Sequence, residues 1–265
     1  MPQTQLTAIT QISRLAGKAI LKIYEQPALR EVVEKEDSSP LTLADRRSHE
    51  CIVEGLKALE ENYPILSEES RQSGSDSLFP YENRKDLSRF WLIDPLDGTK
   101  EFIKRNGEFT VNIALIENHR PVLGVVYVPV RDEMYFAAKG SGAFLEKDGR
   151  RQKLSAGVFD PAQKGMRVVC SRSHIDDDTL AFIEKLPEAK RVSVGSSLKF
   201  LIIARGDAEI YPRLAPTMEW DTAAAQIVLE EAGGSVLQWE NGKPLRYNKE
   251  SLLNPFFVAY GKRKA

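Results

Sequence analysis

The first hydrophobic pattern along the chain is helical. Apolar residues recur every three or four positions over residues 6–23, which is the spacing of one face of an α-helix, and Pro27 would end that helix. A similar pattern over residues 52–59 follows Thr42, which suits an N-cap with Asp45 as its partner three residues later. The sequence therefore predicts two amphipathic helices at the start of the chain.

From about residue 90 the pattern changes to short β-type runs. An apolar run over 90–93 stops at an Asp-Pro pair, and β-rich runs over 110–116 and 122–128 flank a turn-prone segment. The last two runs predict an antiparallel hairpin, and 134–138 could add another strand. Residues 67–87 are polar and rich in turn formers, so we expect a long surface excursion there.

The second half of the chain alternates strands and helices, which predicts an α/β arrangement. A composition shift near residues 149–165 is the best candidate for a boundary between domains 1–150 and 151–265. We expect the first half to be helices that cover an antiparallel sheet. The elements expected in the second half are strands over 167–170, 191–194 and 208–211 and helices over 178–186, 196–204 and 221–232.

The overall composition is that of an ordinary globular protein. The chain has 265 residues, with 37 Lys and Arg against 38 Asp and Glu, which argues against a nonspecific binder of nucleic-acid polymers. No apolar run reaches the roughly 18 residues of a membrane span, and the start lacks a signal-peptide pattern. Two isolated cysteines fit a reducing cytoplasm. Loose attachment at the inner face of the cell membrane and the oligomeric state stay open.

The strongest chemical signal is the hexapeptide Asp94-Pro95-Leu96-Asp97-Gly98-Thr99. Two carboxylates held this close repel each other unless a cation lies between them. Hard cations such as Mg²⁺ prefer oxygen ligands, and the Leu96 carbonyl could supply a further one. The alternative is an ordinary turn, since Asp-Pro and Asp-Gly are common turn formers. A phosphorylated-aspartate phosphatase of the haloacid dehalogenase type is disfavoured, because its two carboxylates are separated by one residue and these by two.

Two further acidic positions support a metal site. The Glu68-Glu69 pair follows a short apolar run, although a solvated acidic loop would look the same. Asp221 stands at the start of a predicted helix, where it could equally be a plain N-cap. Asp45 could likewise be only the capping partner of Thr42. Each position alone has an ordinary structural interpretation, but their combination favours a shared site.

In combination, these motifs resemble the inositol monophosphatase-like superfamily of Mg²⁺-dependent, Li⁺-sensitive phosphatases. The resemblance rests on the Glu68-Glu69 pair, the turn over 94–99 and the Trp-Asp-Thr-Ala-Ala segment over 220–224, and it extends over about residues 5–260. It implies an α+β fold of the layered αβαβα sugar-phosphatase type. An antiparallel sheet would then occupy the N-terminal half and a mixed sheet the C-terminal half.

Within that superfamily the chain is most similar to the 3′(2′),5′-bisphosphate nucleotidase branch, the bacterial CysQ type. The main departure from that pattern is Ser38 in place of Asn, a conservative change in a loop. The segments that carry this similarity are 37–45, 100–103, 105–110, 171–174 and 195–200.

The resemblance implies a role for each matching residue. Asp45 and Thr99 would orient and deprotonate the attacking water, Asp45 could help to hold a third ion, and Glu69 would lie outside the ligand shell. The ligands of two or three Mg²⁺ ions would be Glu68, Asp94, the Leu96 carbonyl, Asp97 and Asp221. The substrate contacts would be Glu68, Gly98, Thr99, His174, Ser196, Lys199, Arg213 and Asp221.

Physical chemistry favours some of these substrate contacts. Arg213 suits a bidentate phosphate contact, and Ser196, at the start of a predicted helix, would lie where anions are favoured. A single Lys or Arg on a helix face is nonetheless more often solvated than bound to a ligand.

We therefore expect a cytoplasmic Mg²⁺-dependent enzyme that hydrolyses 3′-phosphoadenosine 5′-phosphate to AMP and phosphate without a phosphoenzyme. By the same resemblance it could also act on 3′-phosphoadenylyl sulfate. One alternative is a phosphatase of inositol 1-phosphate or fructose 1,6-bisphosphate. The other is a non-catalytic regulator that binds nucleotide or metal. In each case the expected partner is a small molecule, not a nucleic-acid polymer, and no transmembrane segment is expected.

Overall fold

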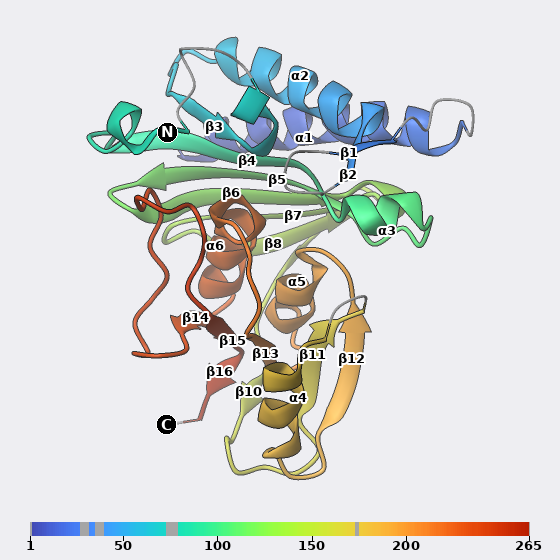
Figure 1. The fold of residues 1–265 in the computed structure, drawn as a ribbon, viewed down its shortest axis with the longest axis vertical. Coiled ribbons are helices and arrows are strands. Elements are labelled where there is room, and N and C mark those ends of the chain that lie inside the picture. Colours follow the sequence, from blue (N-terminus) through green and yellow to red (C-terminus); the bar gives the residue numbers. More distant parts are fainter. Residues whose placement is uncertain (1, 27–31, 35–39, 73–78, 173–174, 265) are drawn as a thin grey trace.

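The computed structural model describes residues 2–26, 32–34, 40–72, 79–172 and 175–264. Helices and sheets stack in five layers (Figure 1): two helices, a seven-stranded sheet, two more helices, a five-stranded sheet and a final helix. The predicted α+β class with αβαβα layers is confirmed.

The outer helical layer consists of α1 (Pro2–Tyr24) and α2 (Leu43–Lys57). Their apolar faces pack on the large sheet, and each buried Leu or Ile side chain there contributes about 1.5–3 kcal/mol. The predicted capping of α2 is confirmed, because the Thr42 hydroxyl accepts from the Ala44 amide at 3.1 Å and the Asp45 carboxylate accepts from the Thr42 amide at 2.7 Å.

A short hairpin precedes α2. Strand β1 (Val32–Glu34) pairs antiparallel with β2 (Pro40–Thr42), and the polar residues 35–39 between them lie outside the described residues. Pro27, the predicted end of the first helix, lies outside them as well.

The seven-stranded sheet has the strand order β3-β4-β5-β6-β7-β8-β9. The predicted hairpin is confirmed as β5 and β6, but the sheet is not wholly antiparallel, since β3 runs parallel to β4 at one edge. Parallel neighbours need a long connection, which the segment between these two strands supplies. The strands are β3 (Ile65–Ser67), β4 (Arg89–Asp97), β5 (Thr110–Glu117), β6 (Arg120–Val128), β7 (Glu133–Ala138), β8 (Gly142–Lys147) and β9 (Arg150–Lys153).

Two local expectations were wrong in this half. Strand β4 does not stop at the Asp-Pro pair but continues to Asp97, with a shift of register between Asp94 and Asp97. The segment between β3 and β4 is not entirely a surface excursion, because Arg84 is buried and donates to the side chain of Asn248 at 3.0 Å. The 3₁₀ turns η2 (Glu68–Gln72) and η3 (Tyr81–Asn83) lie in the same segment, and η4 (Pro129–Arg131) follows β6.

The five-stranded sheet has the order β12-β11-β13-β15-β14, with parallel pairs on one side and antiparallel pairs on the other, so the predicted mixed sheet is confirmed. Its strands are β11 (Arg167–Ser171), β12 (Lys190–Val194), β13 (Ile210–Arg213), β14 (Ser235–Gln238) and β15 (Phe257–Tyr260). A small parallel pair joins β10 (Val158–Phe159) and β16 (Lys262–Arg263). The helices are α4 (Asp177–Glu184), α5 (Leu198–Ala204) and α6 (Ala223–Glu231).

Helix α6 joins the two halves of the chain. It belongs to the C-terminal half but packs on the large sheet, and its residues share one core with β4, β6 and β7 (Figure 1). At Gly124 of β6 a Cβ atom would lie 2.4 Å from the Ile227 side chain and 2.5 Å from the Ala224 carbonyl oxygen. The helix backbone therefore rests directly on the strand. The division into domains 1–150 and 151–265 stays a prediction.

None of the described helices is both long and apolar enough to cross a membrane.

Candidate active site

The acidic residues of the first half gather at the end of two parallel strands. Ser67 of β3 pairs with Ile93 of β4, so Glu68, the first residue of η2, and Asp94 of β4 each directly follow a paired residue. Asp94 is buried, and its carboxylate accepts from the Leu96 amide at 3.1 Å. The shift of register in β4 then carries the chain to Asp97, which pairs with β5 at its first residue.

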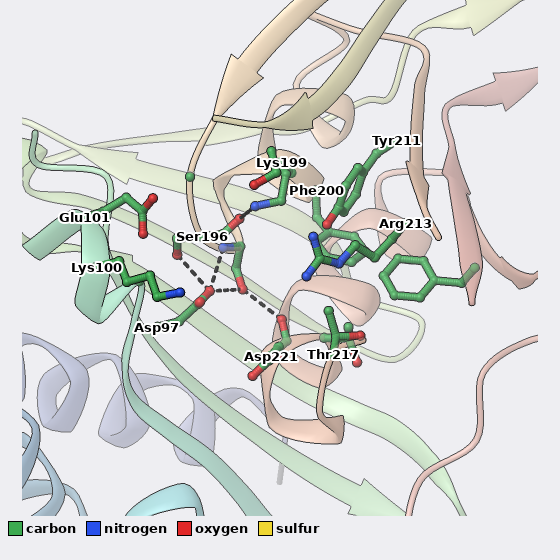
Figure 2. Close-up of a pocket in the computed structure, with 16 residues that line it drawn as sticks. Asp97, Lys100, Glu101, Ser196, Lys199, Phe200, Tyr211, Arg213, Thr217 and Asp221 are labelled. Carbon is green, nitrogen blue, oxygen red and sulfur yellow. Dashed lines mark hydrogen bonds between the residues drawn. The ribbon is translucent and has the colours of Figure 1, made fainter. Parts of the chain in front are cut away.

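Among the described residues, the hydrogen bonds to the Asp97 side chain all reach its Oδ2 atom. Its Oδ2 atom accepts from the Ser196 hydroxyl at 2.7 Å and from the Ser197 amide at 2.6 Å, and the Ser197 hydroxyl lies 2.6 Å away (Figure 2). Thr110 and Asn112 of β5 add weaker contacts to the same oxygen, each at 3.4 Å. This arrangement directs Oδ1 away from the donors.

Ser197 also connects Asp97 to the C-terminal half. Its hydroxyl lies 2.9 Å from the Asp221 carbonyl oxygen and accepts from the Asn112 amide at 2.9 Å. Asp221 lies in the 3₁₀ turn η5 (Glu219–Asp221), just before α6, and its carboxylate accepts from the Met218 amide at 2.9 Å. The N-cap of α6 is Thr222, so Asp221 is not a simple N-cap of that helix.

Neighbouring carboxylates act on the charge of Asp221. Burial, together with the negative charges of Asp97 and Glu68, raises the pKa of Asp221 to about 8. A cation beside these carboxylates would favour the charged form of Asp221.

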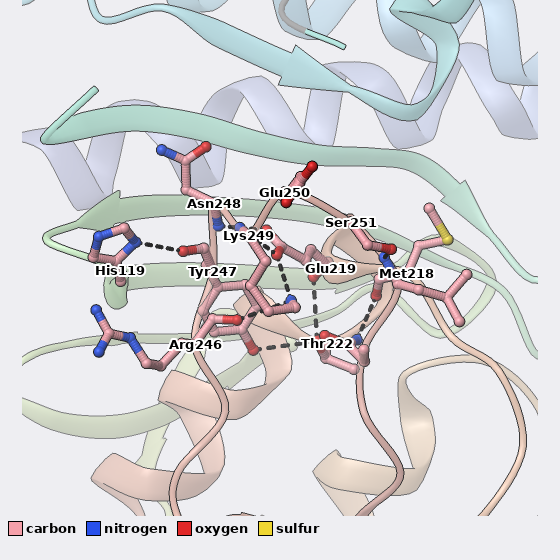
Figure 3. A network of polar contacts seen from close by, with 12 residues as sticks. His119, Met218, Glu219, Thr222, Arg246, Tyr247, Asn248, Lys249, Glu250 and Ser251 are labelled. Atoms are coloured by element: carbon pink, nitrogen blue, oxygen red, sulfur yellow. Dashed lines mark hydrogen bonds and ion pairs between the residues drawn. The ribbon is translucent and has the colours of Figure 1, made fainter. Parts of the chain in front are cut away.

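A buried network around Glu219 positions this turn (Figure 3). The Glu219 carboxylate accepts from the Asn248 amide at 2.7 Å and the Lys249 amide at 3.1 Å, and it forms an ion pair with the Lys249 ammonium. Burial raises the pKa of Glu219, although Lys249 opposes that effect. Since Glu219 is two residues before Asp221, the loop that carries Asn248 and Lys249 fixes the place of Asp221.

Asp45 and Thr99 form a pair next to these carboxylates. The Thr99 hydroxyl lies 3.3 Å from Asp45 Oδ1 and 3.4 Å from the Leu96 carbonyl oxygen, and it can donate to one of them at a time. Asp45 Oδ2 is held by the amide and hydroxyl of Thr42. The capping role of Asp45 is therefore present, but it uses only one oxygen and leaves the other facing Thr99.

The donors at this place match the chemistry of a hard cation. Glu68, Asp94, Asp97, Asp221 and the Leu96 carbonyl supply oxygen atoms only, as Mg²⁺ requires. In the described part of the chain no three His, Cys, Asp or Glu side chains are grouped as they would be in an assembled metal site. The ligand set thus stays a prediction that rests on the type and proximity of its donors.

A pocket opens beside Asp97 and Asp221 (Figure 2). It is lined by Gly98, Ser196, Lys199 and Arg213 among other residues. Lys199 is buried, and its ammonium donates to the Ser196 carbonyl at 2.6 Å and lies 5.5 Å from the centre of the Tyr211 ring. Burial lowers the pKa of Lys199 to about 8, although the charge of Asp97 opposes that effect.

The predicted substrate contacts have different outcomes. Arg213 lines the pocket, one of its nitrogens donates to the Pro216 carbonyl at 2.9 Å, and its Nε has no partner among the described residues. Ser196 does not begin a helix, because α5 starts at Leu198 and Ser196 has a φ of +54°. His174 lies outside the described residues. The roles of the other predicted contacts stay predictions.

Comparison with known proteins places this chain in a family. The model of the inositol monophosphatase family matches residues 1–259. The chain belongs to the inositol monophosphatase family. The 3′(2′),5′-bisphosphate nucleotidase CysQ of Salmonella typhimurium is 47% identical over 253 residues, which is 95% of this chain and 98% of that protein. The CysQ of Buchnera aphidicola is 39% identical over 96% of this chain and 92% of its own length.

Solved structures of the inositol monophosphatase family have the same fold. The crystal structure of CysQ from Bacteroides thetaiotaomicron matches with a TM-score of 0.83 at 43% identity and covers 99% of this chain and 98% of its own. A Thermotoga maritima IMPase matches with a TM-score of 0.77 at 24% identity, over 97% of this chain and 92% of that one, and so supports the fold alone.

Sequence reasoning missed the residues that hold Asp97. Ser197 and Thr110 lie in segments used for the family resemblance but were assigned no role, and Asn112 was placed only in a strand. A signal was present, since Thr110 and Asn112 alternate with apolar residues in a buried strand and therefore share one face of the sheet.

Proposed function

We propose that this protein is a Mg²⁺-dependent 3′(2′),5′-bisphosphate nucleotidase, and thus a phosphoric monoester hydrolase, that converts 3′-phosphoadenosine 5′-phosphate to AMP and phosphate. Curated nucleotidases that are nearly half identical over 95% of the chain support this activity. The observation that carries the proposal is that the Ser197 hydroxyl lies within hydrogen-bond distance of both the Asp97 carboxylate and the Asp221 main-chain carbonyl, from opposite halves of the chain.

The mechanism depends on an attacking water rather than on a protein nucleophile. Thr99 would accept a hydrogen bond from that water, while its own hydroxyl proton is directed to Asp45. Asp45 is suited to act as the base because the amide and hydroxyl of Thr42 hold its other oxygen. A threonine hydroxyl is too weak an acid to ionise by itself, so Thr99 would pass its proton to Asp45 as it takes one from the water.

The carboxylates would hold the cations. When bound, Mg²⁺ ions lower the pKa of the water and neutralise charge on the phosphoryl oxygens and the leaving oxygen. Glu68, Asp94, Asp97, Asp221 and the Leu96 carbonyl are the oxygen donors available for them. Asp97 is suited to this role, because the hydrogen bonds from Ser196 and Ser197 to its Oδ2 atom fix the orientation of the carboxylate.

The pocket beside the carboxylates suits the nucleotide. Arg213 and Lys199 bring positive charge, and the Arg213 Nε lacks a partner in the described residues, so the guanidinium has donors available for the second phosphate. Tyr211 and Phe257 supply ring surface in the same pocket. A 5′-phosphosulfate would present a similar anion, so we also propose activity on 3′-phosphoadenylyl sulfate.

A substrate panel tests the proposal. Phosphate release is measured with adenosine 3′,5′-bisphosphate, 3′-phosphoadenylyl sulfate, inositol 1-phosphate and fructose 1,6-bisphosphate, in Mg²⁺, in EDTA and with added Li⁺. We expect the adenosine compounds to be preferred and EDTA to abolish turnover. Faster release from inositol 1-phosphate would refute the nucleotide preference. Tight nucleotide binding without phosphate release would indicate a regulator.

One variant tests the ligand assignment. Asp94→Asn should lose nearly all turnover, because a neutral amide is a poor Mg²⁺ ligand. Circular dichroism should show an unchanged fold. Normal Mg²⁺-dependent rates in Asp94→Asn would remove this residue from the ligand set.

A further inference from the structure

The carboxylate of Glu108 is buried against the C-terminal half of the chain, and Glu108 is not among the residues that line the pocket. Its Oε1 accepts from Arg172 Nη2 at 2.7 Å, and its Oε2 accepts from Arg172 Nε at 2.8 Å and from the Gly195 amide at 2.8 Å. The Glu108 side chain is 9% exposed, whereas that of Arg172 is 47% exposed. This is a bidentate, charge-assisted contact with a third donor from the backbone.

These three hydrogen bonds join three segments that are distant in the sequence. Glu108 lies just before β5, Arg172 follows β11, and Gly195 begins the turn between β12 and α5. The turn packs closely against the Glu108 segment, because a Cβ at Gly195 would lie 3.2 Å from the Glu108 carbonyl oxygen and 2.7 Å from the Glu101 side chain. Arg172 also donates to the Ser193 carbonyl at 2.8 Å, so it holds the end of β12.

The turn that Glu108 holds is the one that binds Asp97. Ser196, immediately after Gly195, has a φ of +54°, a conformation that costs a non-glycine residue free energy and persists only when its surroundings impose it. In that conformation Ser196 and Ser197 together place three donors within 2.7 Å of Asp97 Oδ2. If the Gly195 amide lost its acceptor, the turn could relax and the donors would move away.

We propose that Glu108 is a positioning residue for the metal-binding carboxylate Asp97, which it orients through Gly195 and the Ser196–Ser197 turn, with Arg172 holding Glu108 in place. This inference rests on the proposed function, since it assumes that Asp97 binds Mg²⁺. Partners of metal ligands typically change metal affinity or activity by 10- to 100-fold when they are replaced.

The chain contains a matched control for this ion pair. Glu209 accepts from Arg167 Nε at 3.0 Å and from the Arg167 amide at 2.6 Å, and its side chain is 8% exposed against 43% for Arg167. Glu209 stands before β13, whereas Arg213 at the other end of that strand lines the pocket. Replacing Glu108 or Glu209 by glutamine therefore breaks a similarly buried Glu–Arg ion pair in each case. Only Glu108 also binds the turn that contacts Asp97.

The experiment compares wild type with Glu108→Gln, Arg172→Lys and Glu209→Gln. The melting temperature of metal-free protein is followed against MgCl₂ concentration, which reports cation binding without turnover. The Mg²⁺ concentration for half-maximal phosphate release from adenosine 3′,5′-bisphosphate is measured in parallel. Arg172→Lys keeps the positive charge but loses the bidentate contact with Glu108.

We expect Glu108→Gln to need about 10-fold or more Mg²⁺ in both titrations and Arg172→Lys to need about 3-fold more. Glu209→Gln should melt earlier without metal but keep the wild-type Mg²⁺ midpoint within about 2-fold. If Glu108→Gln does not fold, Arg172→Lys decides alone, because its side chain is about half exposed.

Two results would overturn the inference while leaving the proposed function in place. One is a wild-type Mg²⁺ midpoint in both Glu108→Gln and Arg172→Lys. The other is a Mg²⁺ midpoint in Glu209→Gln that is shifted as far as that of Glu108→Gln. A wild-type protein with no response to Mg²⁺ would overturn the proposed metal site itself, and the inference with it.

Discussion

The charge of Asp221 should destabilise the metal-free protein, and removing it should stabilise the fold while it ends metal binding. Asp221 is partly buried, and the negative charges of Asp97 and Glu68 act on its carboxylate. Asp221→Asn keeps the shape and an oxygen that can accept from the Met218 amide at 2.9 Å, but it carries no charge. We expect the variant to melt at a higher temperature than wild type in EDTA.

The magnitude follows from the pKa of Asp221. That pKa is 3.8 in an exposed aspartate and about 8 in the folded protein, a gap that corresponds to about 6 kcal/mol. Below pH 3.8 the group is protonated in both states and costs nothing. As the pH rises towards 8, the unfolded chain releases the proton more readily, so the stability of wild type falls. Above pH 8 the full penalty applies.

The assay is thermal unfolding of wild type and Asp221→Asn between pH 5 and pH 9. Since the buried amide still costs desolvation, we expect about half of the penalty to be recovered at pH 9, about 3 kcal/mol, or about 6–12 °C in melting temperature. The advantage should shrink towards pH 5. Saturating Mg²⁺ should raise the melting temperature of wild type only. An Asp221→Asn protein that melts no higher than wild type at pH 9 in EDTA would refute this reasoning.

Three other substitutions should each change one measured quantity. Ser197→Ala removes the hydroxyl that lies 2.6 Å from Asp97, so about 10-fold more Mg²⁺ should be needed for half-maximal phosphate release. Gly98→Ala places a side chain at a φ of +96° and a Cβ 3.0 Å from the Glu108 carbonyl oxygen, which should cost about 1–3 kcal/mol in urea unfolding. Lys249→Met leaves the buried charge of Glu219 unpaired and should cost about 3–5 kcal/mol at pH 8, less at pH 5 where Glu219 can take up a proton.

Each of these expectations has a control. Ser197→Thr keeps the hydroxyl and should recover most of the Mg²⁺ affinity. Gly242→Ala has a similar positive φ of +66° with nothing within 4 Å of the added Cβ, so it measures the conformational cost alone. For Lys249→Met, a loss of stability equal at pH 5 and pH 8 would show that the charge of Glu219 is not the cause.

The parts of the fold that the sequence predicts are those set by local rules. The apolar spacing over residues 6–23 and the Thr42–Asp45 capping pair are encoded within a few turns of helix, and both were confirmed. The hairpin of β5 and β6 needs only one short turn, in which Asn118 and His119 have positive φ values. The candidate residues Asp94 and Asp97 were visible because they lie in one motif.

The rest depends on contacts between segments far apart in the sequence. The parallel pairing of β3 with β4 has no local signature, so the first sheet was expected to be wholly antiparallel. Arg84 resembled a surface residue because its partners lie about 165 positions later. Ser196 was expected in a helix, since its φ of +54° is imposed by Glu108 and Asp97 rather than by its neighbours.

The direct contact of α6 with β6 at Gly124 has a consequence for catalysis. Helix α6 begins two residues after Asp221, and strand β4, which carries Asp94 and Asp97, belongs to the sheet on which the helix rests. Because only a hydrogen atom separates strand from helix there, position 124 sets the spacing between Asp221 and the carboxylates of β4. If these carboxylates hold a cation as proposed, a methyl group at position 124 would widen that spacing and weaken cation binding, although every chemical group would stay intact.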